Sequence, residues 1–215
     1  MKNLLKSRLI VICGYYGSGK TNIAVNLALT AADCGKGVVI VDLDTVNPYF
    51  RTADNAVLLR ERGVITLIPE FANTNVDIPA LPPAFPTVFE RDETVIVDVG
   101  GGAEGSAVLG GFRDDFEKCG YDMYYVFNAN RPENTDTESA LLSLKEIEIS
   151  SGMHFTGIIN NTHMCGETDQ KTIEKGVAQA TEFASAAGLP MLATTAFHSY
   201  LPGVSVMRDV TKKFF

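Results

Sequence analysis

Short apolar runs alternate with longer amphipathic stretches along the whole chain. The apolar runs predict six strands: Arg8–Cys13, Gly37–Leu43, Thr94–Val99, Asp122–Phe127, Phe155–Asn160 and Pro190–Thr194. The amphipathic stretches predict five helices: Lys20–Cys34, Asn55–Arg62, Ser106–Lys118, Glu133–Ser150 and Thr168–Ala187. Strands that are apolar throughout are buried on both faces, which is typical of parallel sheets covered by helices. The pattern therefore predicts an α/β fold with an open, doubly wound sheet that binds ligands at the carboxyl ends of its strands.

Two segments interrupt this alternation. Ile68–Glu93 contains five of the nine prolines, so it cannot be an ordinary central strand and is expected to form a long connection or lid with one short helix at most. Gly100–Gly111 contains six of the nineteen glycines directly after a predicted strand. There we expect mobility and a close approach of the backbone to a ligand.

A glycine-rich sequence directly follows the first predicted strand. It reads Gly14-Tyr15-Tyr16-Gly17-Ser18-Gly19-Lys20-Thr21, a full G-x-x-x-x-G-K-[ST] pattern between a strand and a helix. Such a loop turns its backbone N–H groups inward around a phosphate, and the start of the helix adds the positive end of its dipole. We expect Lys20 to reach the β- and γ-phosphates and the Thr21 hydroxyl to bind Mg²⁺. The predicted nucleotide-binding residues of this element are Gly14, Gly17, Ser18, Gly19, Lys20, Thr21 and Asn22.

Acidic residues end two further apolar runs. Asp42 and Asp44 follow the second strand, where they could hold water on Mg²⁺, orient an attacking water, or simply cap the next helix. Asp98 ends the run Val95–Asp98 and is followed by Gly100 and Gly101, as in a Walker B element. We expect Asp98 to bind Mg²⁺ through water and one of these glycines to offer an N–H to the γ-phosphate.

These three elements together resemble the nucleotide-binding domain shared by MinD, ParA, the nitrogenase iron protein and the CobQ/CobB enzymes. The resemblance extends from Leu9 to about Pro202. It implies a three-layer, mostly parallel sheet of about seven strands, binding of Mg²⁺ and nucleotide, and often a dimer that encloses two nucleotides. It also makes Asp44 the better candidate for activating water, with Asp42 beside it, and adds Asp44 to Thr21 and Asp98 as a predicted metal-site residue.

One position departs from that family. Members with the deviant P-loop carry a signature lysine after the first glycine, and this chain has Tyr15 there. Activation of a partner subunit by that lysine is therefore excluded. If the transition state needs a further cation, Arg51 and Arg131 are the candidates, although either could equally form a surface salt bridge.

Two asparagines, Asn160 and Asn161, lie at the end of the predicted strand Phe155–Asn160. In the resembled family an asparagine at this position reads the purine base, and Asn161 aligns best, with Asn160 second. An amide can face either purine, so it does not choose the base by itself. The carboxylate of the N-K-x-D pattern that reads guanine is replaced by Met164 or His163, which favours ATP over GTP. By the same resemblance Phe197 would pack on the adenine, or it could belong to a bland surface loop.

Composition narrows the class of protein. The 215 residues suit one domain, residues 1–215, with 46% hydrophobic side chains for its core. A net charge of −8 argues against nucleic acid as a partner. Four widely spaced cysteines without a C-x-x-C pair, together with the lack of a signal peptide or membrane span, suggest a cytoplasmic protein with reduced thiols.

Two further signals are weaker. His163-Met164-Cys165 brings soft ligands together without a second pair nearby, so a metal site is disfavoured. The segment 204–215 has apolar residues at helical spacing and two lysines. A last helix packed on the sheet is favoured over a MinD-like membrane-targeting helix.

The sequence thus favours a slow Mg-ATPase that works as a nucleotide-dependent switch, with Lys20, Asp44 and Asp42 as catalytic candidates and with Thr45–Thr52 and Gly100–Gly111 sensing the γ-phosphate. One alternative is an enzyme of the CobQ/CobB or dethiobiotin synthetase type, which uses ATP to activate a small carboxylate in a pocket built from the two irregular segments. Another is a nucleotide-binding regulator that does not hydrolyse its ligand. The family favours a homodimer, whereas the protein partner or acceptor is not indicated.

Overall fold

The computed structural model contains one eight-stranded sheet in which every neighbouring pair of strands is parallel. It describes residues 1–44, 52–69, 81–164 and 167–210. The strands are β1 (Leu9–Cys13), β2 (Val38–Leu43), β3 (Ile65–Leu67), β4 (Thr94–Val99), β5 (Tyr121–Phe127), β6 (Gly157–Asn160), β7 (Met191–Ala196) and β8 (Val204–Val206). The parallel α/β architecture is therefore as predicted, with one strand more than the resemblance implies.

Helices of very different length connect these strands. The α-helices are α1 (Lys20–Asp33), α2 (Ala56–Glu61), α3 (Gly102–Ser106), α4 (Arg113–Cys119), α5 (Thr137–Ser151) and α6 (Gln170–Ala187). Short 3-10 helices lie at Lys2–Leu4, Thr52–Asn55, Phe85–Glu90, Ala107–Phe112 and Pro132–Asn134. Asp136 and Asp169 cap α5 and α6 by accepting hydrogen bonds from the backbone N–H groups of Ser139 and Thr172.

The strand order is β3-β2-β4-β1-β5-β6-β7-β8. The chain runs from β1 toward one edge of the sheet and, after β4, crosses β1 and continues toward the other edge. The order thus reverses at β1, and such a switch point leaves a crevice beyond the carboxyl ends of the central strands. The glycine-rich loop that follows β1 lies at this point.

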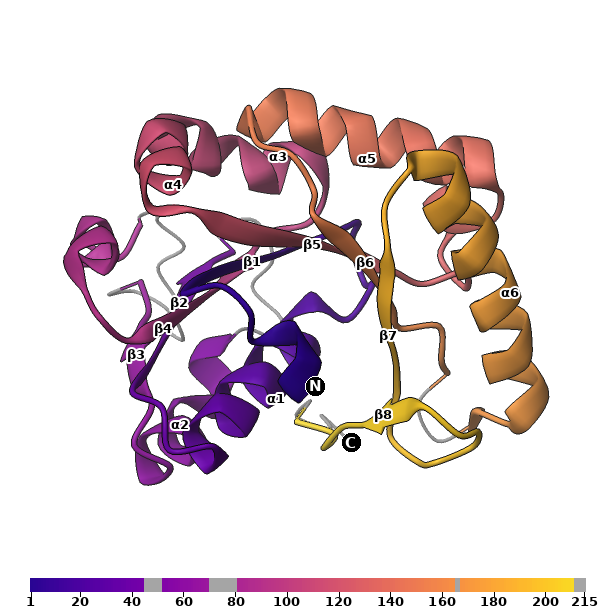
Figure 1. Cartoon of the computed structure of the whole chain (residues 1–215), viewed down its shortest axis with the longest axis horizontal. Coiled ribbons are helices and arrows are strands. Elements are labelled where there is room, and N and C mark those ends of the chain that lie inside the picture. Colours follow the sequence, from indigo (N-terminus) through magenta and orange to yellow (C-terminus); the bar gives the residue numbers. More distant parts are fainter. Residues whose placement is uncertain (45–51, 70–80, 165–166, 211–215) are drawn as a thin grey trace.

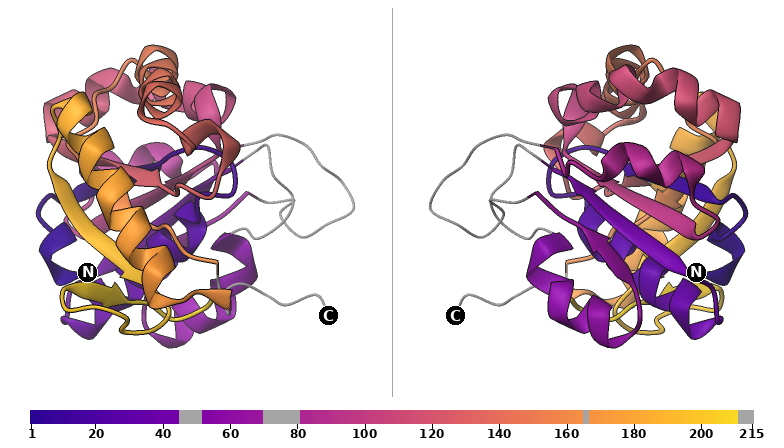
Figure 2. Two further views of the ribbon diagram at one scale, coloured as in Figure 1. Left: turned by 90° about the vertical axis from the view of Figure 1, so that its right-hand side faces the viewer. Right: turned by 90° about the vertical axis from the view of Figure 1, so that its left-hand side faces the viewer.

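Two hydrophobic clusters cover the two faces of the sheet. Alternate residues of β1 point to opposite sides, so Leu9, Val11 and Cys13 join one cluster and Ile10 and Ile12 join the other. The first cluster packs under α4, α5 and α6, and the second packs under α1 and α2. Figure 1 shows the sheet between these layers, and the side views in Figure 2 show the same three-layer arrangement.

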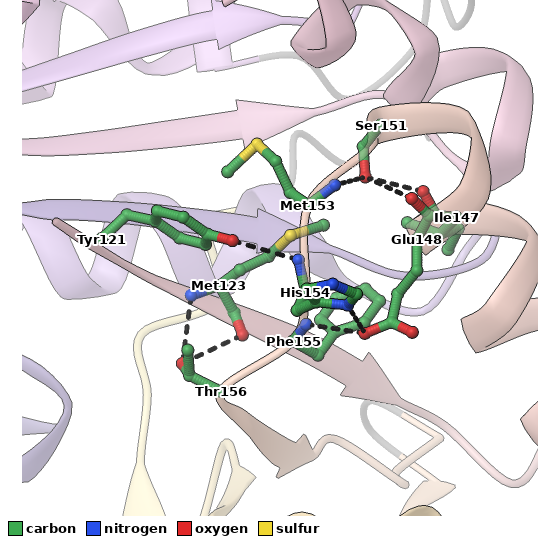
Figure 3. Close-up of polar contacts among 9 residues, drawn as sticks. All are labelled: Tyr121, Met123, Ile147, Glu148, Ser151, Met153, His154, Phe155 and Thr156. Atoms are coloured by element: carbon green, nitrogen blue, oxygen red, sulfur yellow. Dashed lines mark hydrogen bonds and ion pairs between the residues drawn. The ribbon is translucent and has the colours of Figure 1, made fainter. Parts of the chain in front are cut away.

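The connection from α5 to β6 is held by a local polar network (Figure 3). The backbone N–H of Phe155 donates to Oε1 of Glu148 at 3.0 Å, and that of His154 donates to the Tyr121 hydroxyl at 3.0 Å. At the start of β6 the Thr156 hydroxyl accepts from the backbone N–H of Met123 at 3.1 Å. The bond to Glu148 joins this segment to α5, and the bonds to Tyr121 and Met123 join it to β5.

The structure differs from the sequence predictions in several places. Strands β3 and β8 were not predicted, since each is only three residues long. The predicted helix Ser106–Lys118 is divided among α3, a 3-10 helix and α4, so the glycine-rich segment is helical over most of its length. The predicted proline-rich connection holds the 3-10 helix Phe85–Glu90, and its residues 70–80 lie outside the described chain.

The predicted C-terminal helix is wrong for residues 204–210. Val204–Val206 form β8 beside β7, and Met207 is buried in the cluster under α1. Asn26 of α1 holds the next residue, because its amide accepts from the Arg208 backbone N–H at 2.8 Å and donates to the Arg208 carbonyl at 2.9 Å. Pairing of the backbone with β7 thus outweighs the helical spacing of the side chains. Of the described helices, none is long and apolar enough to cross a membrane.

Candidate functional site

The loop after β1 has the backbone that its glycines allow. Gly14, Gly17 and Gly19 have φ values of +150°, +66° and +92°, which side-chain-bearing residues rarely adopt. Gly19 is also the N-cap of α1 and offers no capping side chain, and the first turn of α1 contains no acidic residue. The first N–H groups of a helix have no intrahelical acceptor, so this helix start suits an anion.

Lys20 lies inside this loop. Its side chain is only 7% exposed, and its Nζ donates to the Tyr15 carbonyl at 3.0 Å. Burial lowers the pKa of the ammonium, while the negative charges of Asp98 and Asp44 raise it. The buried ammonium donates to a neutral carbonyl of its own loop. An anionic ligand in the loop would stabilise its positive charge more strongly.

The strand register places Asp98 at the centre of the site. In the parallel pairing of β2 with β4, Asp42 stands opposite Asp98, so two carboxylates point the same way from adjacent strands. Burial, and next the charge of Asp42, raise the pKa of Asp98 to about 7, while hydrogen bonding from the Thr21 hydroxyl opposes the shift. Thr52 also donates its hydroxyl to Oδ2 of Asp98 at 2.9 Å. Within the described chain, Oδ1 of Asp98 is buried without a hydrogen-bond partner.

The two acidic residues at the carboxyl end of β2, Asp42 in the strand and Asp44 just after it, occupy different environments. Asp42 is fully buried, and its carboxylate accepts from the backbone N–H groups of Asp44 at 3.1 Å and of Ala53 at 3.3 Å. Through the Ala53 N–H, Asp42 holds the first turn of the 3-10 helix Thr52–Asn55. The alternative that Asp42 and Asp44 only cap the next predicted helix stays a prediction. Asp44 is 8% exposed, and its carboxyl lies against Gly100, where an added Cβ would be 3.1 Å from Oδ1. Asp44 thus lies between the end of β2 and the glycine-rich segment after β4.

Asn161 connects the P-loop to the strands beyond β5. Its Nδ2 donates to the Ser18 carbonyl at 2.7 Å, and its Oδ1 accepts from the Thr195 hydroxyl at 2.7 Å. It is 1% exposed, and an added Cβ on Gly19 would collide with its amide. The residue that aligned best as the base reader therefore lies directly against the P-loop, although its reading of a base stays a prediction. Thr195 was expected in a loop that packs on the adenine together with Phe197, whereas it lies in β7 and its bond to Asn161 was not predicted.

The other predicted base and nucleotide residues have local partners. The Oδ1 of Asn160 accepts from the Thr162 backbone N–H at 3.1 Å, which joins it to its own loop rather than to the P-loop. The Asn22 side chain accepts from Nδ2 of Asn26 at 2.7 Å and so belongs to the network that holds Arg208. Phe197 is half-buried, and its ring centroid lies 4.6 Å from that of His163.

The glycine-rich segment after β4 contacts the P-loop directly. The backbone N–H of Gly102 donates to the Gly14 carbonyl at 3.1 Å. The Tyr16 ring lies against Gly101, and its hydroxyl donates to Glu104 at 3.4 Å. The start of α3 is thus positioned by the same loop that would hold a phosphate.

Of the two candidate arginines, only Arg131 lies in the described chain. Its Nε donates to the Gly17 carbonyl at 2.8 Å. Arg51 and residues 45–51 of the predicted sensor segment fall outside the described residues. Thr52 at the end of that segment is fully buried and bonded to Asp98, a contact that the sequence did not indicate.

The residues at this centre fit a magnesium ion. Mg²⁺ prefers oxygen ligands, and the Asp98 carboxylate and the Thr21 hydroxyl lie together here. Oδ1 of Asp98, which is buried and has no hydrogen-bond partner among the described residues, is the position at which a cation would relieve an unfavourable charge. The described residues contain no group of three or more His, Cys, Asp or Glu side chains arranged around a metal. Cys165, one of the three residues of the disfavoured metal site at 163–165, lies outside the described residues. The thiols of Cys13, Cys34 and Cys119 are free.

Comparison with family models and with curated protein sequences gave no match. Solved structures did match. Cell division protein FtsY from Thermotoga maritima is 19% identical, with a TM-score of 0.60 over 87% of this chain and 61% of its own. The signal recognition particle receptor FtsY from Elizabethkingia anophelis in complex with GDP is 18% identical, with a TM-score of 0.55 over 88% and 57%. The 54 kDa signal recognition particle protein from Aeropyrum pernix in complex with GDP is 20% identical, with a TM-score of 0.55 over 86% and 40%.

The chain thus spans about three fifths or less of the length of these three structures. At these identities the likeness concerns the fold, and it does not single out the MinD and ParA branch. The strand order, the P-loop and the structural neighbours agree on one conclusion: the chain has an α/β fold of the P-loop nucleoside-triphosphatase type.

Proposed function

We propose that this protein binds a Mg²⁺–nucleoside triphosphate in the P-loop and works as a nucleotide-dependent switch. The observation that carries the proposal is the convergence of a buried ammonium, a hydroxyl and a buried carboxylate at one end of the sheet. These are Lys20, Thr21 and Asp98, and the carboxyl oxygen of Asp98 that lacks a partner in the described chain lies among them. Burying the charges of Lys20 and Asp98 costs free energy. Binding of a polyanion beside Lys20 and of a cation beside Asp98 would offset that cost.

Each residue then has a chemical role. Lys20 and the backbone N–H groups of the P-loop stabilise phosphate charge. Thr21 and Asp98 hold Mg²⁺, which neutralises phosphate oxygens when it is bound. Asp44 is the proposed residue for positioning an attacking water, because it lies between the end of β2 and Gly100 at the rim of the same site. Asp42 supports Asp44 by accepting its backbone N–H rather than by acting on water itself.

The switch is supported by two contacts between irregular segments and the site. Thr52 donates to Asp98, and Gly102 donates to the Gly14 carbonyl. A metal bound at Asp98 and a phosphate in the P-loop would compete with or rearrange both contacts. Nucleotide binding would in this way change the positions of the segments on either side of β4, which is how a γ-phosphate is sensed.

ATP is the proposed nucleotide. In this chain the place of a guanine-reading carboxylate after Asn161 is taken by Met164, which is 49% exposed. Two of the similar structures contain GDP, so guanine nucleotides must be compared in the same experiment. Slow hydrolysis, a homodimer and a cytoplasmic location belong to the same proposal. No contact of the described residues favours activation of a small carboxylate or a regulator that never hydrolyses its ligand.

A thermal-shift panel tests the proposal. Wild type and Lys20→Ala are melted with Mg-ATP, Mg-ADP and Mg-GTP, and phosphate release is then measured on whichever nucleotide binds. A ligand at about 100 times its Kd adds roughly 2.7 kcal/mol, which for this size raises Tm by about 5–10 °C. We expect this rise with ATP in wild type and not in Lys20→Ala. A panel without any rise would refute nucleotide binding.

A further inference from the structure

Arg131 lies on the P-loop although it is 114 residues away from it in sequence. Its Nε donates to the Gly17 carbonyl at 2.8 Å. Its guanidinium lies flat against the glycine, since a Cβ added to Gly17 would be 2.8 Å from Cζ and 3.1 Å from Nη2. We propose that Arg131 is a nucleotide-contacting residue that supplies, within the same chain, a second phosphate-binding cation beside Lys20. This inference deepens the proposed function and rests on it.

The loop that carries Arg131 is held by several hydrogen bonds. The backbone N–H of Arg131 donates to the Asn128 carbonyl at 3.1 Å, and the Arg131 carbonyl accepts from the Asn134 N–H at 2.9 Å. Asn134 is 1% exposed, and it donates from Nδ2 to the Asn128 carbonyl at 3.3 Å. The hydroxyl of the buried Tyr125 donates to Oδ1 of Asn134 at 3.1 Å. The backbone of this loop is therefore held by a buried scaffold at the end of β5, and the guanidinium adds its own bond to Gly17. Both reduce the entropy that the loop and the side chain would lose on binding.

The same loop is hydrogen-bonded to the residue next to Asn161, the asparagine that contacts the P-loop. The backbone N–H of Ala129 donates to the Thr162 hydroxyl at 3.0 Å, next to Asn161. Asn161 in turn donates to the Ser18 carbonyl, and Arg131 donates to the Gly17 carbonyl. Two consecutive carbonyls of the P-loop, those of Gly17 and Ser18, are thus bound by two connected loops. These bonds fix the guanidinium of Arg131 and the P-loop relative to one another.

The chemistry of the guanidinium suits a phosphate better than a carbonyl alone. The bond to Gly17 uses one of five N–H donors, and the two Nη groups carry the other four in a planar fork. Charge-assisted bonds from that fork to phosphate oxygens are stronger than neutral ones. The position after the first glycine, which holds Tyr15, offers no such cation, so Arg131 is the arginine that the described structure places on the P-loop.

The test compares Arg131→Gln and Arg131→Lys with wild type, using Mg-ATP and Mg-GTP at about 50 and 300 mM NaCl. Arg62→Gln is the matched control, because Arg62 is also exposed and pairs with Asp33 at the far end of α1. Melting without ligand checks folding. We expect Arg131→Gln to bind the triphosphate at least about tenfold more weakly, with a flatter salt dependence and an unchanged Tm without ligand. Arg131→Lys should recover most of the affinity, and Arg62→Gln should match wild type.

Three results would overturn the inference. The first is an affinity of Arg131→Gln within about twofold of wild type. The second is an equal loss in Arg131→Gln and Arg131→Lys at both salt concentrations, since then the bond to Gly17 and not the charge would matter. The third is the absence of nucleotide binding by wild type, which would refute the proposed function as well. The first two leave the proposed function intact, so the two failures are distinguishable.

Discussion

Asp98→Asn should make the ligand-free protein more stable while it removes the response to Mg²⁺. The substitution keeps an oxygen that can accept the Thr52 hydroxyl, and it removes a charge that is fully buried opposite Asp42. Because the pKa of Asp98 is raised from 3.8 to about 7, the folded state holds the proton more tightly than the unfolded state. Stability contributed by this group is therefore lost as the pH rises from about 4 through about 7.

The size of the effect follows from the same pKa. Between about pH 5 and pH 8, the wild type should lose about 2–3 kcal/mol of its free energy of unfolding through this carboxyl. The Asp98→Asn variant should not show this loss, since an amide does not titrate. For a chain of this length, the gain of the variant at pH 8 corresponds to a Tm higher by about 5–10 °C, and the gain should shrink as the pH falls. In contrast, stabilisation by Mg-nucleotide should fall to the level seen with nucleotide and a chelator.

The assay is thermal melting from about pH 5 to pH 8 in the presence of a chelator, followed by titration of Mg-ATP. Asp114→Asn is the charge control, because Asp114 is exposed on α4 and should leave the profile as in wild type. The reasoning fails if Asp98→Asn has the same Tm as wild type at pH 8, or if its advantage does not depend on pH. Full retention of the Mg²⁺ response would exclude Asp98 as a metal ligand.

Three further substitutions test the surrounding structure. Gly105→Ala should lower Tm by several degrees, because the added Cβ would overlap the backbone of Gly100, and an unchanged Tm would count against this close approach. Asn161→Ala should cost about 1–3 kcal/mol in denaturant unfolding through loss of two buried hydrogen bonds; a cost below about 0.5 kcal/mol would contradict their importance. Asn26→Ala should speed proteolysis near Arg208, since both hydrogen bonds that hold this residue are lost, and an unchanged cleavage rate would argue against that role.

Much of the fold was predictable because its strands are long and apolar. The observed bounds of β4 are those predicted, and β1 and β2 differ by one residue. Strands β3 and β8 have three residues each, which is too short for a periodic signal. The apolar residues around Met207 have a helical spacing by coincidence. Residues Val204–Val206 form a strand because their backbone pairs with β7.

The centre of the site was predictable to the level of residue types and less so in the roles of individual residues. The P-loop and Asp98 followed from local motifs with fixed spacing. The different roles of Asp42 and Asp44 depend on which backbone N–H groups lie near each carboxylate. No local sequence pattern indicates where these N–H groups lie. The contacts of Asn161 and Arg131 with the P-loop join positions more than one hundred residues apart. Only the strand order brings such loops together.

Direct titration of the wild-type protein and Lys20→Ala with ATP, by calorimetry in Mg²⁺ and again in excess chelator, tests the central claim most directly. The account predicts saturable binding at one site per chain in the wild type, weakened by removal of Mg²⁺ and abolished in Lys20→Ala. Binding that persists unchanged in Lys20→Ala, or a wild type that binds neither ATP nor GTP, would contradict it.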